Sequence, residues 1–217
     1  MKTAELLQQG LHALACELPE GASEALLDYL VLLEKWNRTI NLTAIRERER
    51  MVTQHLLDSL SVLPSLGAAD HRLVDIGTGA GLPGIPLAIA RPELQVTLVE
   101  PNQKKVAFLR QAKAELNLSN VEVQGVRAED VVAGQGFDVV ISRAFADLPD
   151  FVKVGARLVA PKGRLIAMKG LVPYEEIARL PADASTTVHA VDVPQLAATR
   201  HLIEVRFATS GQPEEAA

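Results

Sequence analysis

The chain of 217 residues has few of the features that mark secreted, membrane-spanning or metal-binding proteins. It contains one cysteine, Cys16, which excludes a disulfide framework or a cysteine-based metal site within the chain. No apolar run reaches the roughly 18 residues of a membrane span, and the opening MKTAELLQQG lacks the apolar core of a signal peptide. The histidines are scattered without metal-ligand spacing, so we predict no metal. We expect a cytoplasmic protein with a reduced thiol and no membrane partner.

Charge of neither sign dominates the chain. Lys and Arg together number 22 against 27 for Asp and Glu, a formal net charge of −5. This balance argues against indiscriminate nucleic-acid binding but leaves room for a local basic face. A hydrophobic content of 48% with 23% charged residues is typical of a globular protein, and the length suits one α/β domain with a modest extension.

The first part of the chain has the apolar spacing of helices. Leucines recur at helical intervals over 5–18 and 23–36, and Ser23 is the expected cap residue of the second run. A third apolar stripe covers 47–63 and ends before Pro64. We therefore predict an N-terminal helical extension over residues 1–66.

From residue 72 the pattern changes to strands that alternate with helices, which predicts a doubly wound parallel sheet. The last two strands are joined by a short loop, which predicts an antiparallel hairpin at one sheet edge. This is the plan of a class I S-adenosylmethionine-dependent methyltransferase, a Rossmann-like seven-stranded sheet, here over 67–209 with a flexible tail at 210–217. The expected strands are 72–77, 95–100, 121–127, 137–143, 163–169, 185–193 and 200–208, and the expected helices are 82–90, 102–116 and 147–158.

A glycine turn, DIGTGAGLPG at 75–84, separates the first of these strands from a helix. Glycines at 77, 79 and 81 let the backbone pass close to a ligand. The dinucleotide pattern G-x-G-x-x-G arises only if it starts at Gly79, and it then puts Pro83 and Pro86 where a pyrophosphate needs N–H donors. S-adenosylmethionine has no phosphate and can spare those donors.

Acidic residues follow the neighbouring strands. Glu100, at the end of the second strand, is placed to accept both hydroxyls of a ribose, which both cofactor classes possess. Glu129, after the third strand, is placed to accept from an adenine amine, although a solvated loop acid has the same pattern. Asp75 either orients the glycine turn or binds the amino group of the methionine moiety.

The sequence lacks the residues that two classes of methylation reaction require. Methylation of a pyrimidine C5 needs a cysteine near the fourth or fifth strand, and Cys16 lies in the first helix. Methylation of an exocyclic amine typically uses a Pro-Pro-aromatic loop after the fourth strand, where this chain has SRAFA at 142–146. Guanine N7 carries a lone pair and no proton, so it requires no general base.

Arg143 and Phe145 in that loop suit a guanine, because an arginine addresses the O6 atom and an aromatic ring stacks on an unpaired base. Lys169 adds a cation at the same edge. Methylation makes the guanine cationic, so we expect these cations at O6, at phosphates or around the cofactor. The alternatives are a structural ion pair for Arg143, core packing for Phe145 and a surface position for Lys169. His55 lies three residues before Asp58 on one helix face and is a further catalytic candidate, or part of a helix-surface pair.

Several motifs together resemble one family, the bacterial ribosomal RNA small subunit methyltransferase G family, also called glucose-inhibited division protein B. The resemblance runs from about residue 20 to 208 and implies an S-adenosyl-L-methionine-dependent enzyme that methylates one guanine at N7 in the 530 loop of 16S rRNA. It implies cofactor contacts at Gly77, Leu82, Ala128, Glu129 and Arg143. The motifs are WN at 36–37, NLT at 41–43, HLLDSL at 55–60, DIGTGAGLPGIPLAIARP at 75–92, SRAFA at 142–146 and MKG at 168–170.

The resemblance leaves the roles of His55, Arg143 and Lys169 open. Given the net charge, we expect a small basic rim around the site. We also expect a monomer whose substrate is 16S rRNA within a small-subunit ribosomal particle. The alternatives are a methyltransferase for a small metabolite, an NAD(P)-dependent oxidoreductase and a non-catalytic RNA-binding module. The intact glycines and Glu100 speak against the last of these.

Overall fold

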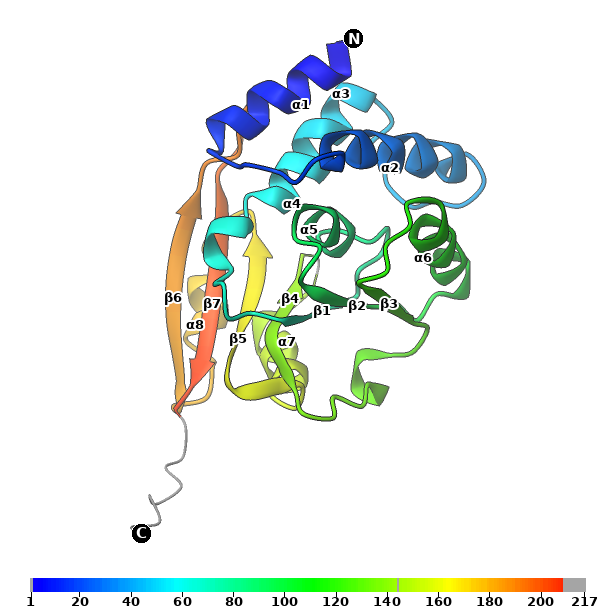
Figure 1. Cartoon of the computed structure of the whole chain (residues 1–217). Helices are drawn as coiled ribbons and strands as arrows, with labels where there is room; N and C mark the ends of the chain where they lie inside the picture. Colours follow the sequence, from blue (N-terminus) through cyan, green and yellow to red (C-terminus); the bar gives the residue numbers. More distant parts are fainter. Residues whose placement is uncertain (1, 144, 209–217) are drawn as a thin grey trace.

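The predicted sheet is present in a computed structural model that describes residues 2–143 and 145–208. In these residues seven strands form one sheet in the order β3-β2-β1-β4-β5-β7-β6 (Figure 1). Strands β1 to β5 run parallel, and β7 is antiparallel to both β5 and β6, which confirms the closing hairpin. The bounds are β1 Arg72–Ile76, β2 Gln95–Val99, β3 Val121–Gln124, β4 Phe137–Ser142, β5 Val159–Lys169, β6 Ala184–Val191 and β7 Arg200–Phe207.

Helices cover both faces of the sheet because the buried strands alternate apolar side chains between two cores. In β4, Val139 and Ile141 join the core under the N-terminal helices, whereas Val140 joins the core under α7. The helices are α1 Lys2–Ala13, α2 Ala22–Asn37, α3 Arg48–Met51, α4 Asp58–Leu60, α5 Gly84–Ala90, α6 Gln103–Glu115, α7 Leu148–Gly155 and α8 Tyr174–Ile177, with a π-helical segment at Val52–Leu57.

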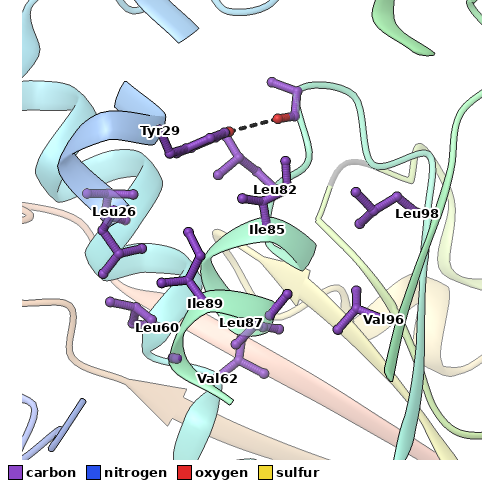
Figure 2. Close-up of a cluster of buried hydrophobic side chains, with 14 of the residues drawn as sticks. Leu26, Tyr29, Leu60, Val62, Leu82, Ile85, Leu87, Ile89, Val96 and Leu98 are labelled. Carbon is purple, nitrogen blue, oxygen red and sulfur yellow. Dashed lines mark hydrogen bonds between the residues drawn. The ribbon is translucent and has the colours of Figure 1, made fainter. Parts of the chain in front are cut away.

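The N-terminal helices share their core with the sheet. Leu26 of α2 and Leu60 of α4 lie beside Ile85 and Ile89 of α5 (Figure 2). This packing carries α2 and the segment 48–60 over the edge of the sheet where β1 and β4 end. The division between an extension at 1–66 and a methyltransferase domain at 67–209 stays a prediction, and the tail at 210–217 lies outside the described residues.

Two local predictions about this region are wrong. The first helix ends at Ala13 rather than residue 18, because Ala15 turns the chain with a left-handed φ of 48°. Ser23 caps nothing: the N-cap of α2 is Gly21, and the Ser23 hydroxyl accepts from Gln8 Nε2 at 3.0 Å. The third predicted helical stretch is present over 48–60, and its middle part is the π-helical segment Val52–Leu57.

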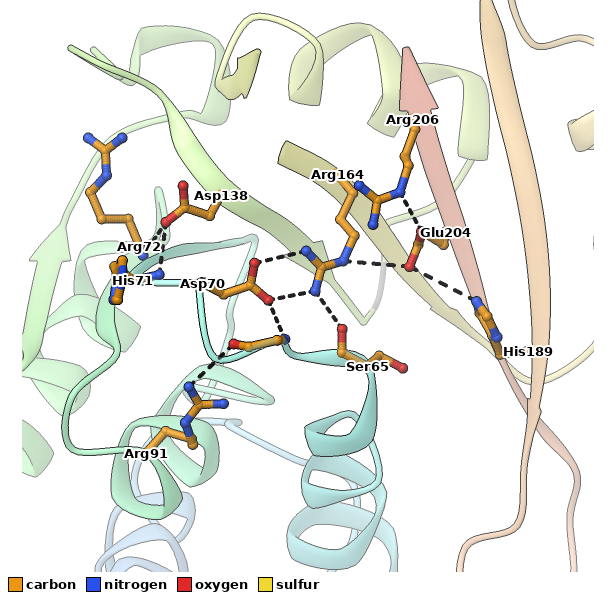
Figure 3. Close-up of polar contacts among 11 residues, drawn as sticks. Ser65, Asp70, His71, Arg72, Arg91, Asp138, Arg164, His189, Glu204 and Arg206 are labelled. Atoms are coloured by element: carbon orange, nitrogen blue, oxygen red, sulfur yellow. Dashed lines mark hydrogen bonds and ion pairs between the residues drawn. The ribbon is translucent and has the colours of Figure 1, made fainter. Parts of the chain in front are cut away.

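A buried ion-pair network lies near the amino ends of the strands, away from the glycine turn (Figure 3). Both carboxylate oxygens of Asp70 accept from Arg164, at 2.9 and 2.6 Å, and Arg164 also donates to the Ser65 carbonyl. Glu204 of β7 lies 3.5 Å from Arg164 Nε. The network ties the connection before β1 to β5 and β7, and we assign it to stability.

Within residues 2–143 and 145–208, no helix combines the length and apolar character needed to cross a membrane. In the same residues, no group of three or more His, Cys, Asp or Glu side chains is placed to hold a metal ion.

Candidate active site

The glycine turn between β1 and α5 leaves open space beside its backbone. Gly77, Gly79 and Gly81 have φ values of +66°, +61° and +87°, which favour glycine over other residues. A Cβ on Gly77 would meet no heavy atom within 4 Å, and one on Gly79 would meet only a carbonyl at 3.9 Å. A Cβ on Gly81 would instead lie 2.4 Å from Ile85 Cδ1. The first two glycines therefore border a cradle that accommodates a ligand, and the third allows helix packing.

Asp75 holds this turn in shape. Its Oδ2 accepts from the Thr78 hydroxyl at 2.6 Å and from the Gly84 N–H at 2.9 Å. Of the two roles expected for Asp75, orienting the turn is therefore the one that its contacts support. Its Oδ1 is buried and has no hydrogen-bond partner among the described residues, which leaves an acceptor for a ligand donor. Burial raises the pKa of Asp75 to about 7, although these two hydrogen bonds and Arg143 act in the opposite direction.

Glu100 and Tyr29 contact the turn from two sides. Glu100 is buried at the end of β2, where its Oε2 accepts from the Gly79 N–H at 3.0 Å and its Oε1 from the Asn102 N–H at 2.9 Å. Each oxygen keeps a second lone pair, so the carboxylate still fits the predicted ribose. From α2, the Tyr29 hydroxyl donates to the Ala80 carbonyl at 2.7 Å (Figure 2).

The other cofactor candidates lie along the same sheet edge. Ala128 and Glu129 form a short 3₁₀ turn after β3, the strand that neighbours β2. Ala128 packs against the core under α7, whereas the Glu129 side chain is exposed. Leu82 is buried below the turn. The structure thus places these members of the predicted set at the carboxyl ends of β1, β2 and β3, and Arg143, the remaining member, directly after β4, with the roles of all of them still predictions.

A cavity of about 370 Å³ opens beside the cradle. All three predicted catalytic candidates line it: Arg143 and Lys169 at the ends of β4 and β5, and His55 from the π-helical segment. The Ser142 hydroxyl donates to the Ile76 carbonyl at 2.8 Å, which fixes the end of β4 against the end of β1 where the glycine turn begins. The lining residues are Ile45, Gln54, His55, Asp58, Arg143, Met168, Lys169, Gly170 and Arg200.

The charges in this cavity, which we call the cationic cavity, are predominantly positive. The carboxylate of Asp58 is buried, with its Oδ1 2.9 Å from Arg200 Nε and its Oδ2 3.5 Å from Arg143 Nη1. Arg143 also donates to the Gln54 carbonyl at 3.1 Å. Lys169 Nζ lies 2.9 Å from Glu176, and Glu176 also accepts from the Leu148 N–H. One carboxylate between two guanidinium groups leaves a net positive lining.

His55 is buried rather than exposed on a helix surface, so the alternative interpretation of a helix-surface pair with Asp58 is wrong. Burial, together with the positive charge of Arg143, lowers the pKa of His55 to about 4. Its Nε2 lies 2.9 Å from the Thr43 hydroxyl and its Nδ1 3.1 Å from the Gln54 carbonyl. The ring is therefore neutral at pH 7, with both nitrogens in hydrogen bonds.

The aromatic candidates differ in exposure. Phe145 is half-buried, with its ring centroid 5.7 Å from that of Phe151, so core packing accounts for part of its surface. Trp36 is also partly buried and packs against the core, with its ring centroid 5.9 Å from that of Phe108. Sequence reasoning missed Tyr174 of α8, which is 75% exposed and lies two residues before Glu176, the partner of Lys169.

Sequence reasoning also missed Arg200, although a signal for it exists. Because β7 is antiparallel, its first residues lie at the edge where β5 ends, and Lys169 pairs in register with His201. A predicted hairpin therefore brings the start of its second strand to the carboxyl edge of the sheet. An arginine at that start is a candidate for the cationic cavity.

Comparisons with known proteins agree with this architecture. The family profile described as rRNA small subunit methyltransferase G matches residues 22–203. A protein named ribosomal RNA small subunit methyltransferase G from Nitrosospira multiformis is 50% identical over 96% of this chain and 99% of its own length. A protein of the same name from Chromobacterium violaceum is 53% identical over 94% of this chain and 98% of its own.

The similarity of this chain to solved structures is evidence about its fold and not about its activity. A methyltransferase from Geobacter sulfurreducens superposes with a TM-score of 0.59 at 20% identity, over 83% of this chain and 90% of that one. TrmN from Thermus thermophilus gives a TM-score of 0.57 at 17% identity, over 72% of this chain and 53% of that one. Together with the strand order and the closing hairpin, these likenesses establish the class I S-adenosylmethionine-dependent methyltransferase fold.

Proposed function

The chain belongs to the rRNA small subunit methyltransferase G family, and on that premise we propose that it methylates one guanine at N7 in the 530 loop of 16S rRNA. The methyl donor in this proposal is S-adenosyl-L-methionine. The observation that carries the proposal is an open glycine cradle beside a cationic cavity in which the described residues offer no available general base.

The cradle fits the proposed donor. Gly77 and Gly79 leave room for close backbone approach, and Asp75 Oδ1 is an acceptor without a partner among the described residues. Glu100 would hold the ribose, and Ala128 with Glu129 would border the adenine. When bound, S-adenosylmethionine supplies an electrophilic methyl group on its sulfonium. The residues of the chain bind and orient the reactants, which is the main requirement of an in-line displacement.

The cationic cavity fits a nucleophile that carries no proton. The lone pair of His55 accepts from Thr43, and the carboxylate of Asp58 is bound by two arginines. Neither side chain is placed to take a proton from an exocyclic amine. Guanine N7 attacks with its own lone pair, so its methylation needs no such group.

The positive lining has a further consequence for the pose of the base. Methylation makes the guanine cationic, and a cation on N7 would therefore oppose the reaction. We place Arg143 at O6 or at a phosphate, and Arg200 and Lys169 at phosphates, with Asp58 offsetting part of the positive charge near the product. Phe145 stays a proposed base-stacking contact through the part of its ring that remains exposed.

The test is methyl transfer to ribosomal particles. The protein, S-adenosylmethionine with a labelled methyl group and small subunits from a strain that lacks the gene are incubated together. N7-methylguanine is then mapped by strand cleavage at the modified base. We expect one labelled guanine in the 530 loop, with faster labelling of the particle than of naked 16S rRNA.

Small subunits from the parent strain serve as the control, since their guanine is already methylated and should take up no label. Transfer to a small metabolite with RNA untouched would replace the substrate proposal, because a cavity of about 370 Å³ also has the size of a small-molecule site. Label on any other base atom would contradict the N7 assignment.

A further inference from the structure

Three sequence motifs outside the cofactor cradle meet in one hydrogen-bonded chain: WN, NLT and HLLDSL. It begins with Asn37 at the end of α2. Asn37 Oδ1 accepts from the backbone N–H groups of Leu42 and Thr43 at 2.9 and 3.0 Å, and its Nδ2 donates to the Thr43 carbonyl at 3.0 Å. These three bonds fix Thr43 in the loop between α2 and α3.

The next link is the Thr43 hydroxyl. It accepts from the Ile45 N–H at 3.1 Å, so its own hydrogen is available for His55 Nε2 at 2.9 Å. His55 Nδ1 lies 3.1 Å from the Gln54 carbonyl, which can only accept. The ring hydrogen therefore sits on Nδ1, and the lone pair of Nε2 accepts from Thr43. One tautomer satisfies both contacts.

The π-helical segment takes one donor away from the Gln54 carbonyl. In an α-helix this carbonyl would accept from the N–H of Asp58. Here the Asp58 N–H donates to the carbonyls of Thr53 and His55 instead. The Gln54 carbonyl accepts from His55 Nδ1 and from Arg143 Nη1, both at 3.1 Å. Insertions of this kind occur often at functional sites.

We propose that Thr43 and His55 are positioning residues for Arg143: the chain from Asn37 through Thr43, His55 and the Gln54 carbonyl fixes the guanidinium in the cationic cavity. The proposal rests on the proposed function and changes the role of His55 from a catalytic to a positioning residue. Without the Thr43 hydroxyl, Nε2 loses its buried donor, and the imidazole is free to exchange tautomer and withdraw from the Gln54 carbonyl. The Gln54 carbonyl, one of the two groups that hold Arg143, then loses the imidazole contact that fixes its position.

Thr43→Val tests the first link, with Thr43→Ser as the matched control that keeps the hydroxyl. We expect Thr43→Val to lower kcat on small subunits by roughly 10- to 100-fold, the range that follows from a misplaced contact group. KM for S-adenosylmethionine and affinity for S-adenosylhomocysteine should stay close to those of the wild type, while the thermal midpoint should fall by a few degrees because the hydrogen bonds of the Thr43 hydroxyl are lost. Thr43→Ser should restore most of kcat. A wild-type kcat in Thr43→Val, or a Thr43→Ser variant as slow as Thr43→Val, would overturn the proposal.

A second measurement needs no substrate. Long-range ¹H–¹⁵N spectra of the full chain, assigned with His55→Gln, report the tautomer and the pKa of the His55 ring. We expect a neutral ring with its hydrogen on Nδ1 from pH 7 down to pH 5. In Thr43→Val the pKa should rise, since the neutral form loses its donor while Arg143, Arg200, Lys169 and Asp58 still surround the ring.

A hydrogen on Nε2, or a ring that protonates near its ordinary pKa, would refute the chain of contacts whatever the substrate is. If no RNA is methylated but the spectra show the expected tautomer, the proposed function fails and the chain of contacts stands.

Discussion

Gly77→Asp should abolish binding of S-adenosylmethionine in a protein that still folds. The φ of +66° costs any residue with a Cβ about 1–2 kcal/mol, which a folded domain tolerates. The new carboxylate points into the open space beside the turn, where the donor must lie. Isothermal titration with S-adenosylmethionine and S-adenosylhomocysteine measures the loss, which we expect to exceed roughly 100-fold, or about 3 kcal/mol.

Gly134→Asp is the matched control for this substitution. Gly134 has a φ of +57° and open space around its Cβ position, but it lies in the loop that leads into the amino end of β4. The two variants share the backbone strain and the added charge, and only Gly77→Asp should lose the ligand. Wild-type affinity in Gly77→Asp would move the cofactor site away from the turn.

Arg143→Ala should lower kcat by roughly 10²- to 10³-fold, the loss typical of one removed electrostatic contact in an active site. The free energy of unfolding should fall by much less than the activation barrier rises. The buried Asp58 carboxylate keeps its ion pair with Arg200, whose Nε lies 2.9 Å from Asp58 Oδ1. Single-turnover methylation of small subunits gives the rate, and thermal unfolding gives the stability.

Arg164→Ala gives the opposite pattern and serves as the comparison. Its removal leaves Asp70 buried without its ion-pair partner, which costs about 3–5 kcal/mol, while the folded fraction should keep its rate. An Arg143→Ala variant that is unstable but catalytically normal would assign Arg143 to a structural ion pair.

Local sequence signals were sufficient for most of the fold. The alternation of strands with helices, the glycine turn and the short loop before residue 200 each depend on neighbouring residues, and the sheet follows them. The π-helical segment was not predictable in this way. Residues 52, 56 and 60 have the spacing of an α-helix and are buried in the structure, so the periodicity over 47–63 carries no sign of the inserted residue.

The contacts of the candidate site depend on residues far apart in the sequence. The sequence predicts that Glu100 lies near a ribose. It does not predict the bond from the Gly79 N–H to Glu100, because that bond depends on the distance between the ends of two strands. Arg200 and Asp58 are separated by 142 positions, and their ion pair forms only because the hairpin and the π-helical segment reach the same edge. The sequence supplied the residue types, and tertiary packing decides which of them meet.

The most direct test of this account is a crystal structure of the protein with S-adenosylhomocysteine. We predict density along Gly77 and Gly79, with the ribose at Glu100 and the sulfur directed toward Arg143 and the cationic cavity. Density elsewhere, with the glycine turn empty under saturating ligand, would contradict the assignment of the cofactor site and of the reaction built on it.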